Sequence, residues 1–308
     1  MPGRANELLG HPAGARLLLL NADDLGMYPG VSEGIAEVIE AGLVRSTSVI
    51  VPSPWAVEAK RWAALHPEAS LGVHLTLVRD LGGADWSPLA GPTQVPSLVD
   101  RDGRFLPLER MDEMLARARI EEVELEFRAQ LQAVLGAGLR PTHLDWHCVI
   151  SGGRPDVFER TLVIAREHGL AVRVTEQPWI DRLQSLGLPT AEHPLLDSYE
   201  VPVDAKPEVY LKMLRELPEG LTQWAMHPGR GDEASRTHDP DGWRIRESDT
   251  EFLTSPAAAR AIRDEGIVLV SFAELRRAWL AAGETRSPPE GPSRRDPPQG
   301  PAPAAPHS

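Results

Sequence analysis

Aspartates and histidines recur where short apolar stretches of this 308-residue chain end. Imidazole and carboxylate donors with few thiols suit Zn²⁺ or a similar divalent ion. One carboxylate and two histidines would hold such an ion, and a second carboxylate would stay free to act as a general base toward water. The candidates are Asp23 and Asp24 after four leucines, and His74, His143, Asp145, His147 and His227 at or beyond other apolar runs.

Each of these residues has a simpler interpretation when it is taken alone. An aspartate after a strand often caps the next helix, and a single histidine at a strand end is usually structural. Because the carboxyl ends of parallel strands meet at one edge of a sheet, the repetition favours a shared site there. His227 precedes a rigid Pro-Gly turn, which would fix its imidazole for protonating a leaving group or holding an oxyanion.

The elements that must position these groups alternate between helix and strand. Glycine followed by an apolar residue closes four helical patterns, at Gly42, Gly138, Gly169 and Gly266, and a β-type run soon follows each. This rhythm predicts an α/β fold with a parallel sheet wound by helices, either open or closed as a barrel. The expected strands cover residues 17–20, 46–51, 71–75, 142–145, 171–174, 222–226 and 268–270.

Spacing and composition also predict the remaining organisation of the chain. The longest helix is expected over residues 112–136, with a solvated face that carries Glu121, Glu122, Glu124, Glu126 and Arg128. Residues 78–107 and 177–207 are rich in loop-forming residues and are expected to be lids or insertions. We expect a flexible N-terminus at residues 1–15, one catalytic domain at 16–283 and a disordered Pro-rich tail at 284–308.

The overall charge restricts the classes of partner. A formal charge of −13 disfavours a nucleic-acid or anionic-membrane surface, so a neutral or cationic small ligand is expected. The single cysteine, Cys148, excludes an internal disulfide and is expected to be a buried hydrophobe that points away from His147. Without a visible targeting segment we expect a cytoplasmic protein, and a homodimer is one assembly state that stays open.

Six segments of the chain resemble, in order and spacing, the successive signatures of the YdjC-like carbohydrate deacetylases. The resemblance covers residues 17–275 and implies an irregular (β/α) barrel, a divalent metal ion such as Mg²⁺ or Zn²⁺, and removal of an N-acetyl group from an amino sugar or short chito-oligosaccharide. The segments are Asn21–Gly26, Arg45–Val49, Gly72–Leu77, Pro141–His147, Met226–Gly229 and Leu253–Pro256.

The resemblance also implies a role for each matching residue. Asp23 is similar to the family's catalytic base, and His227 to its proton donor at the leaving amine. Asp24, His74 and His147 resemble its metal ligands. After His147 the chain reads Cys-Val-Ile, where the family has two more histidines. The residues expected to contact substrate are His143, Asp145, Trp86, Trp146 and Arg230, with the two tryptophans as candidate sugar-stacking platforms.

Two other functions remain open from the sequence. The same barrel and ligands could serve a metal-dependent isomerase, aldolase or phosphoesterase, although no Gly-rich phosphate loop or strand-end lysine stands out. A catalytically silent sugar-binding protein is the other alternative. The five residues that resemble the family's machinery weigh against it, because a binding protein needs no base beside a metal.

Overall fold

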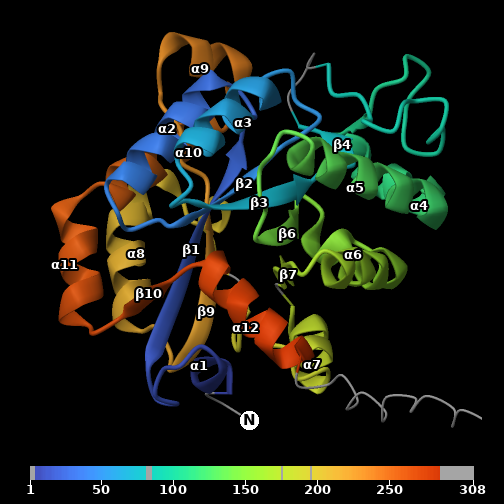
Figure 1. Ribbon diagram of the computed structural model, residues 1–308. Coiled ribbons are helices and arrows are strands. Elements are labelled where there is room, and N and C mark those ends of the chain that lie inside the picture. The colour runs from blue at the N-terminus through green and yellow to red at the C-terminus, as the bar shows by residue number, and fades with distance from the viewer. Residues whose placement is uncertain (1–3, 81–84, 175, 195, 285–308) are drawn as a thin grey trace, which may run out of the picture.

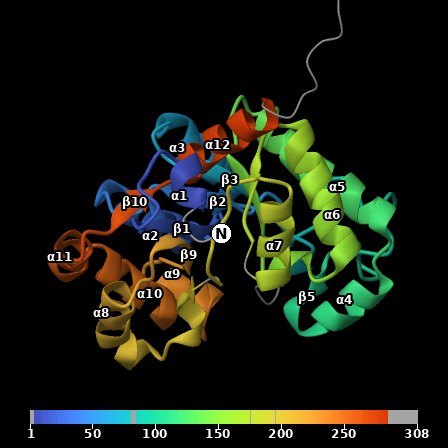
Figure 2. The same cartoon turned by 90° about the horizontal axis from the view of Figure 1, so that it is seen from below.

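A computed structural model describes residues 4–80, 85–174, 176–194 and 196–284, and its framework is one parallel sheet. Strands follow the order β7-β6-β3-β2-β1-β9-β8, and β10 also pairs with β1. The sheet curls into an incomplete barrel with helices around its outside (Figures 1 and 2), which confirms the predicted parallel α/β fold. Its strands are β1 (Arg16–Leu25), β2 (Ser46–Val49), β3 (Ser70–Leu75), β6 (His143–Trp146), β7 (Ala171–Val172), β8 (Leu196–Asp197), β9 (Gly220–Met226) and β10 (Val268–Val270).

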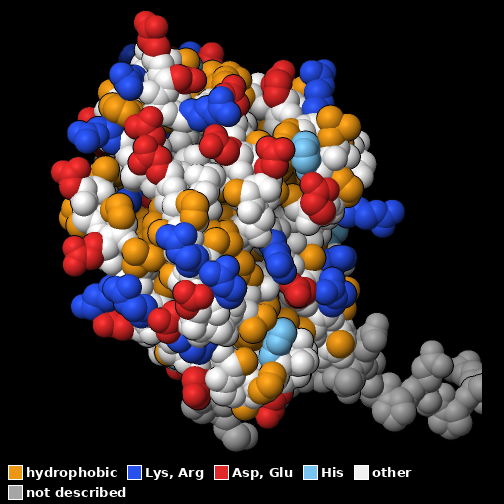
Figure 3. Space-filling view, turned by 90° about the vertical axis from the view of Figure 1, so that its left-hand side faces the viewer, with side chains coloured by type: hydrophobic (Ala, Val, Ile, Leu, Met, Phe, Trp, Pro, Cys, Tyr) orange, Lys and Arg blue, Asp and Glu red, His pale blue; other side chains and the backbone are white. Residues whose placement is uncertain are grey.

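Helices precede or follow most strands, as the alternating pattern requires. None of the described helices is long and apolar enough to span a membrane. The helices are α1 (Arg4–Leu8), α2 (Pro29–Glu40), α3 (Ala56–Leu65), α4 (Met111–Arg117), α5 (Ile120–Leu135), α6 (Pro155–Glu167), α7 (Gln177–Ser185), α8 (Lys206–Arg215), α9 (Glu233–His238), α10 (Trp243–Leu253), α11 (Pro256–Asp264) and α12 (Phe272–Glu284). Figure 3 shows acidic, basic and apolar side chains interspersed on the face that α2, α8 and α11 border.

Strand β1 is the centre of the sheet. Its four leucines are at most 3% exposed, as expected for a strand buried on both faces. One edge of β1 pairs with β9 over residues 16–22, while the other pairs first with β10 and then with β2. The carboxyl end of β1 therefore lies in the sheet between β2 and β9.

The predicted helix over residues 112–136 is wrong in one respect, because α4 and α5 are separate. Ala118 leaves the helical conformation with ψ of 125°. Arg117 donates to the carbonyls of Ser97 and Val99, and the Arg119 amide donates to the Ser97 hydroxyl. The long loop thus supplies partners to both helix ends at the break, which local periodicity cannot reveal.

The same loop corrects the assignment of a solvated face on α5. Glu126 is fully buried and accepts hydrogen bonds from the backbone amides of Leu89 and Ala90. Glu122 is 6% exposed and accepts from the Ser97 amide. These carboxylates hold the loop against the helix. Residues 85–107 are otherwise mostly turns, closed by pairing of β4 (Val78–Arg79) with β5 (Leu106–Pro107).

Two other segments contain more structure than the sequence predicted. Residues 177–207 hold α7, β8, the start of α8 and short 3₁₀ turns at Ser198–Glu200 and Val203–Ala205. Within the expected flexible N-terminus, α1 forms and buried Asn6 donates to the carbonyls of Pro12, Ala13 and Ala15. The predicted Pro-rich tail lies outside the described residues, apart from Glu284.

Candidate active site

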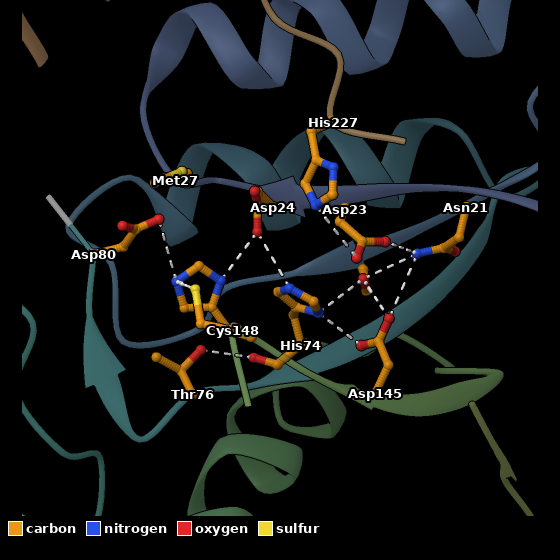
Figure 4. A network of polar contacts seen from close by, with 12 residues as sticks. Asn21, Asp23, Asp24, Met27, His74, Thr76, Asp80, Asp145, Cys148 and His227 are labelled. Carbon is orange, nitrogen blue, oxygen red and sulfur yellow. Dashed lines mark hydrogen bonds and ion pairs between the residues drawn. The ribbon is translucent and has the colours of Figure 1, made fainter. Parts of the chain in front are cut away.

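Three predicted metal ligands converge at the carboxyl edge of the sheet. Asp24 comes from the end of β1, His74 from β3, and His147 directly follows β6. Asp24 Oδ1 lies 3.2 Å from His74 Nε2 and 3.1 Å from His147 Nδ1. Both imidazoles thus point a ring nitrogen at the same carboxylate oxygen, although the three residues are far apart in sequence. Figure 4 shows His74 turned toward Asp24.

The backbone separates the two adjacent aspartates. Asp24 has φ of 77°, a left-handed conformation that is uncommon for a residue other than glycine. The register between β1 and β2 also shifts between Ala22 and Leu25. As a result, Asp24 faces the histidines, whereas Asp23 Oδ1 accepts hydrogen bonds from Asn21 Nδ2 at 2.6 Å and Arg173 Nη1 at 2.8 Å.

Arginines set the charge of both carboxylates. Burial would raise the pKa of Asp24, but the Arg246 guanidinium, 2.9 Å from its Oδ2, and hydrogen bonds from the two histidines hold that pKa well below its usual value. Burial raises the pKa of Asp23, and Arg173 limits that rise. The aspartate with the higher pKa is the better proton acceptor of the two, and the other is suited to stay ionised as a ligand.

His74 is oriented from behind by a buried carboxylate. Asp145 Oδ1 lies 2.9 Å from His74 Nδ1, and Asp145 Oδ2 accepts a hydrogen bond from Ser48 and lies 3.3 Å from Arg173 Nη2. Asp145 is therefore a supporting residue inside the barrel rather than an accessible substrate contact. A carboxylate behind a ligating histidine fixes the orientation of its ring and raises its basicity.

His227 directly follows β9 and lies beside Asp23 (Figure 4). Its Nε2 is 4.0 Å from Asp23 Oδ2, and its Nδ1 is 2.9 Å from the Ser198 hydroxyl. The Tyr199 ring packs edge-on against the imidazole, with centroids 4.6 Å apart. Burial lowers the pKa of His227 well below its usual value, which favours a neutral ring before the reaction begins.

These groups line one cavity of about 780 Å³. Its wall also includes residues that the sequence analysis did not select. Arg173 follows β7, so the rule that selected the other strand-end residues could have found it. Arg246 and Asp239 come from the α9–α10 region, where no strand end marks them. The additional lining residues with charged or aromatic side chains are Asp80, Glu109, Asp197, Tyr199, His238, Asp239, Asp241 and Arg246.

Several predicted substrate contacts lie away from the cavity. Trp86 is fully buried and packs 5.5 Å from the His147 ring, so it offers no exposed face for a sugar. Arg230 lies on the surface and pairs with Glu33 and Glu37. His143, at the start of β6, is buried and stacks on Phe272. Trp146 does line the cavity, but it is only 6% exposed.

The position of Cys148 also corrects the sequence analysis. Cys148 has φ of 57°, so the strand geometry that would turn its side chain away has already ended. Its Sγ lies 3.3 Å from His147 Nε2 and faces the cavity. Cys148 is therefore an exposed neighbour of a predicted ligand and not a buried hydrophobe.

The donor set fits a divalent metal ion at Asp24, His74 and His147. Three donors of the types that Zn²⁺ and similar ions prefer converge there, and each imidazole has a partner at its other ring nitrogen. Asp23, His74 and Asp145 also lie close together, but the Arg173 guanidinium occupies the space between the two aspartates. Because a cation already neutralises that group, we assign the candidate metal position to the first set.

A curled parallel sheet with polar groups gathered at its carboxyl edge places the chain among the α/β-barrel enzymes, which bind their ligands at this edge. Within that class, the chain belongs to the family of YdjC-like proteins, whose model matches residues 17–264. This confirms the resemblance found in the sequence.

Named relatives match over nearly their whole length. The carbohydrate deacetylase of Thermoanaerobacter pseudethanolicus is 30% identical over 265 residues, which cover 85% of this chain and 100% of that protein. The carbohydrate deacetylase of Thermus thermophilus is 33% identical and covers 82% of this chain and 91% of its own length. The crystal structure of a candidate cellobiose-phosphate cleavage protein from Enterococcus faecalis has a TM-score of 0.72 at 30% identity, over 85% of this chain and 99% of that one.

Proposed function

We propose that this protein is a carbohydrate deacetylase that hydrolyses the N-acetyl group of an amino sugar or a short N-acetylated oligosaccharide. The observation that carries the proposal is that Asp23 and His227 lie 4.0 Å apart in one cavity that the three candidate metal ligands also line. A base and an acid on either side of a reacting carbonyl are what amide hydrolysis requires. The names of the relatives support the same reaction.

Asp24, His74 and His147 would hold the divalent ion. An ion in that position would polarise the acetyl carbonyl toward attack. The two imidazole nitrogens favour Zn²⁺ or a comparable transition metal over Mg²⁺, which prefers oxygen ligands. Arg246 pairs with Asp24 Oδ2 and so leaves Oδ1 to face the histidines.

Asp23 is the proposed base. Its carboxylate would take a proton from water, whose oxygen then forms a bond to the acetyl carbon. Arg173 and Asn21 hold Asp23 Oδ1, so Oδ2 is the oxygen that faces His227 and the cavity. Fixing the base in this way reduces the reorganisation needed during proton transfer.

His227 is the proposed acid. It would deliver a proton to the sugar nitrogen as the C–N bond breaks, which yields acetate and the free amine. A neutral imidazole must first gain that proton, and the Asp23 carboxylate, the proposed acceptor of the water proton, lies 4.0 Å from Nε2. The proton taken from water could therefore pass through Asp23 to His227.

The cavity wall favours a substrate without negative charge. Its acidic side chains include Asp80, Glu109 and Asp241, whereas its basic side chains, Arg173 and Arg246, are buried against aspartates. A phosphorylated sugar would bring its charge toward these carboxylates. We therefore expect uncharged or amine-bearing N-acetyl sugars to be hydrolysed faster than their phosphorylated counterparts.

The test is acetate release from a panel of N-acetylated sugars by the metal-stripped protein, with Zn²⁺, Co²⁺, Ni²⁺ or Mg²⁺ added back. Metal-dependent release from any member supports the proposal. If the ion binds but no member of the panel is hydrolysed, the proposal fails. That result would favour a metal-dependent isomerase or a catalytically silent sugar-binding protein.

A further inference from the structure

A buried ion pair adjoins the backbone of His227. Lys206 on α8 and Asp249 on α10 are both fully buried, with Nζ of the lysine 2.6 Å from Oδ1 of the aspartate. Tyr210 is also buried and donates to the same Oδ1 at 2.8 Å. Burying two charges is costly, and such a pair often contributes no net stability. Its place next to the candidate acid calls for another explanation.

The ion pair is connected to His227 along two routes. Asp249 Oδ2 accepts a hydrogen bond of 2.9 Å from the His227 backbone amide. The Tyr210 hydroxyl oxygen also lies 3.4 Å from the Ser198 carbonyl oxygen, and the Ser198 hydroxyl contacts His227 Nδ1 at 2.9 Å. One buried cluster therefore holds both the backbone of His227 and the residue that contacts its ring.

We propose that Lys206, Asp249 and Tyr210 are positioning residues that aim His227 Nε2 at the leaving nitrogen. Both carboxylate oxygens of Asp249 accept hydrogen bonds: one from the His227 amide and the other from Lys206 and Tyr210. None of the three side chains lines the active-site cavity. The inference rests on the proposed function, in which His227 is the acid.

The direct test is the double variant Lys206→Met/Asp249→Asn, which removes both charges and avoids leaving one of them buried alone. Lys212→Met is the matched control, because Lys212 lies on the same helix but is exposed. Misplacing the acid should lower kcat for an N-acetyl sugar by about 10- to 100-fold in the double variant. The KM and metal content should stay unchanged, and the control should behave like the wild-type protein.

A second substrate distinguishes a misplaced His227 from a defect elsewhere in the active site. The leaving group of 4-nitrophenyl acetate departs without being protonated, so its hydrolysis should be nearly unaffected in the double variant. An equal loss on the amide and the ester, with the metal retained, would overturn the proposal by indicating a defect elsewhere in the site. Unchanged amide hydrolysis would overturn it as well.

A spectroscopic measurement decides the inference even if the proposed activity is absent. The ring ¹⁵N signals of His227 in the Zn²⁺-loaded protein should shift in the double variant and in Tyr210→Phe, but not in Lys212→Met. Unmoved signals would contradict the positioning role. By contrast, a wild-type protein that hydrolyses no N-acetyl sugar would contradict the proposed function and leave this measurement valid.

Discussion

The two candidate ligand histidines are supported by different kinds of structure. His74 lies within β3. Its Nδ1, the ring nitrogen that does not face Asp24, lies 2.9 Å from the fully buried Asp145. His147 lies beyond β6, next to Cys148 with its left-handed backbone. Its Nε2, the ring nitrogen that does not face Asp24, lies 3.7 Å from Asp80. The Asp80 side chain is 24% exposed.

We call the His74 side, which the sheet supports, the rigid half of the site, and the His147 side, which lies beyond its strand, the adaptable half. Asp145 also accepts from Ser48 and pairs with Arg173, so the sheet fixes the His74 ring on several sides. The His147 ring depends on the segment after β6, where Cys148 already has a left-handed backbone. Changes to supporting residues should therefore have larger effects on the His74 side.

Removing either ligand should have the largest effect and should erase the difference between the halves. We expect His74→Ala and His147→Ala each to weaken Zn²⁺ binding by more than about 100-fold, because the loss of a ligand should exceed the loss of an outer partner. Competition with a chelator of known affinity measures the effect. If either variant binds Zn²⁺ as the wild-type protein does, that residue is not a ligand.

Neutralising the buried support should have the next largest effect. Asp145→Asn should weaken Zn²⁺ binding by about 10- to 100-fold. It should also lower the free energy of unfolding by about 3 kcal/mol, because buried Arg173 loses one of its two carboxylates. Metal titration and urea unfolding of the metal-free protein measure the two effects separately.

Neutralising the outer carboxylate of the other half should have a smaller effect. Asp80→Asn should weaken Zn²⁺ binding by less than about 10-fold, the low end for an outer partner, and should leave the unfolding free energy unchanged. The same titration and unfolding experiments apply. Equal losses for Asp80→Asn and Asp145→Asn would break the comparison between the halves.

The smallest effect concerns the backbone beside His147. Cys148→Gly should raise the free energy of unfolding by up to about 1 kcal/mol relative to Cys148→Ala, because glycine adopts φ of 57° without strain. Both variants lack the thiol, so urea unfolding of the pair isolates the backbone term. A more stable alanine variant would mean that the segment is not strained.

Sequence reasoning reached the rigid half of the site better than the adaptable half. Strand periodicity placed Asp24 and His74 at one sheet edge, because parallel strands end together. The direction of Cys148 depends on a backbone change that begins after the strand ends, which no residue pattern indicates. Arg246 and Asp249 reach the site region from a helix, and only tertiary packing brings them to Asp24 and His227.

The fold also divides into features that local sequence patterns predict and features that depend on contacts with a loop elsewhere in the chain. The parallel sheet followed from the repeated helix–glycine–strand pattern, and the strands lie close to their predicted positions. The break between α4 and α5 did not follow, because its partners come from residues 97–99 of a distant loop. Burial of Glu126 and Trp86 likewise depends on that loop and not on local composition.

The central claim is that the adjacent aspartates divide two roles, and Asp23→Asn tests it most directly. We predict that this variant loses turnover on an N-acetyl sugar that the wild-type protein hydrolyses, by about 100-fold or more, while elemental analysis finds its Zn²⁺ content unchanged. Loss of Zn²⁺ together with turnover would contradict the account, because Asp23 would then be a ligand and not the base.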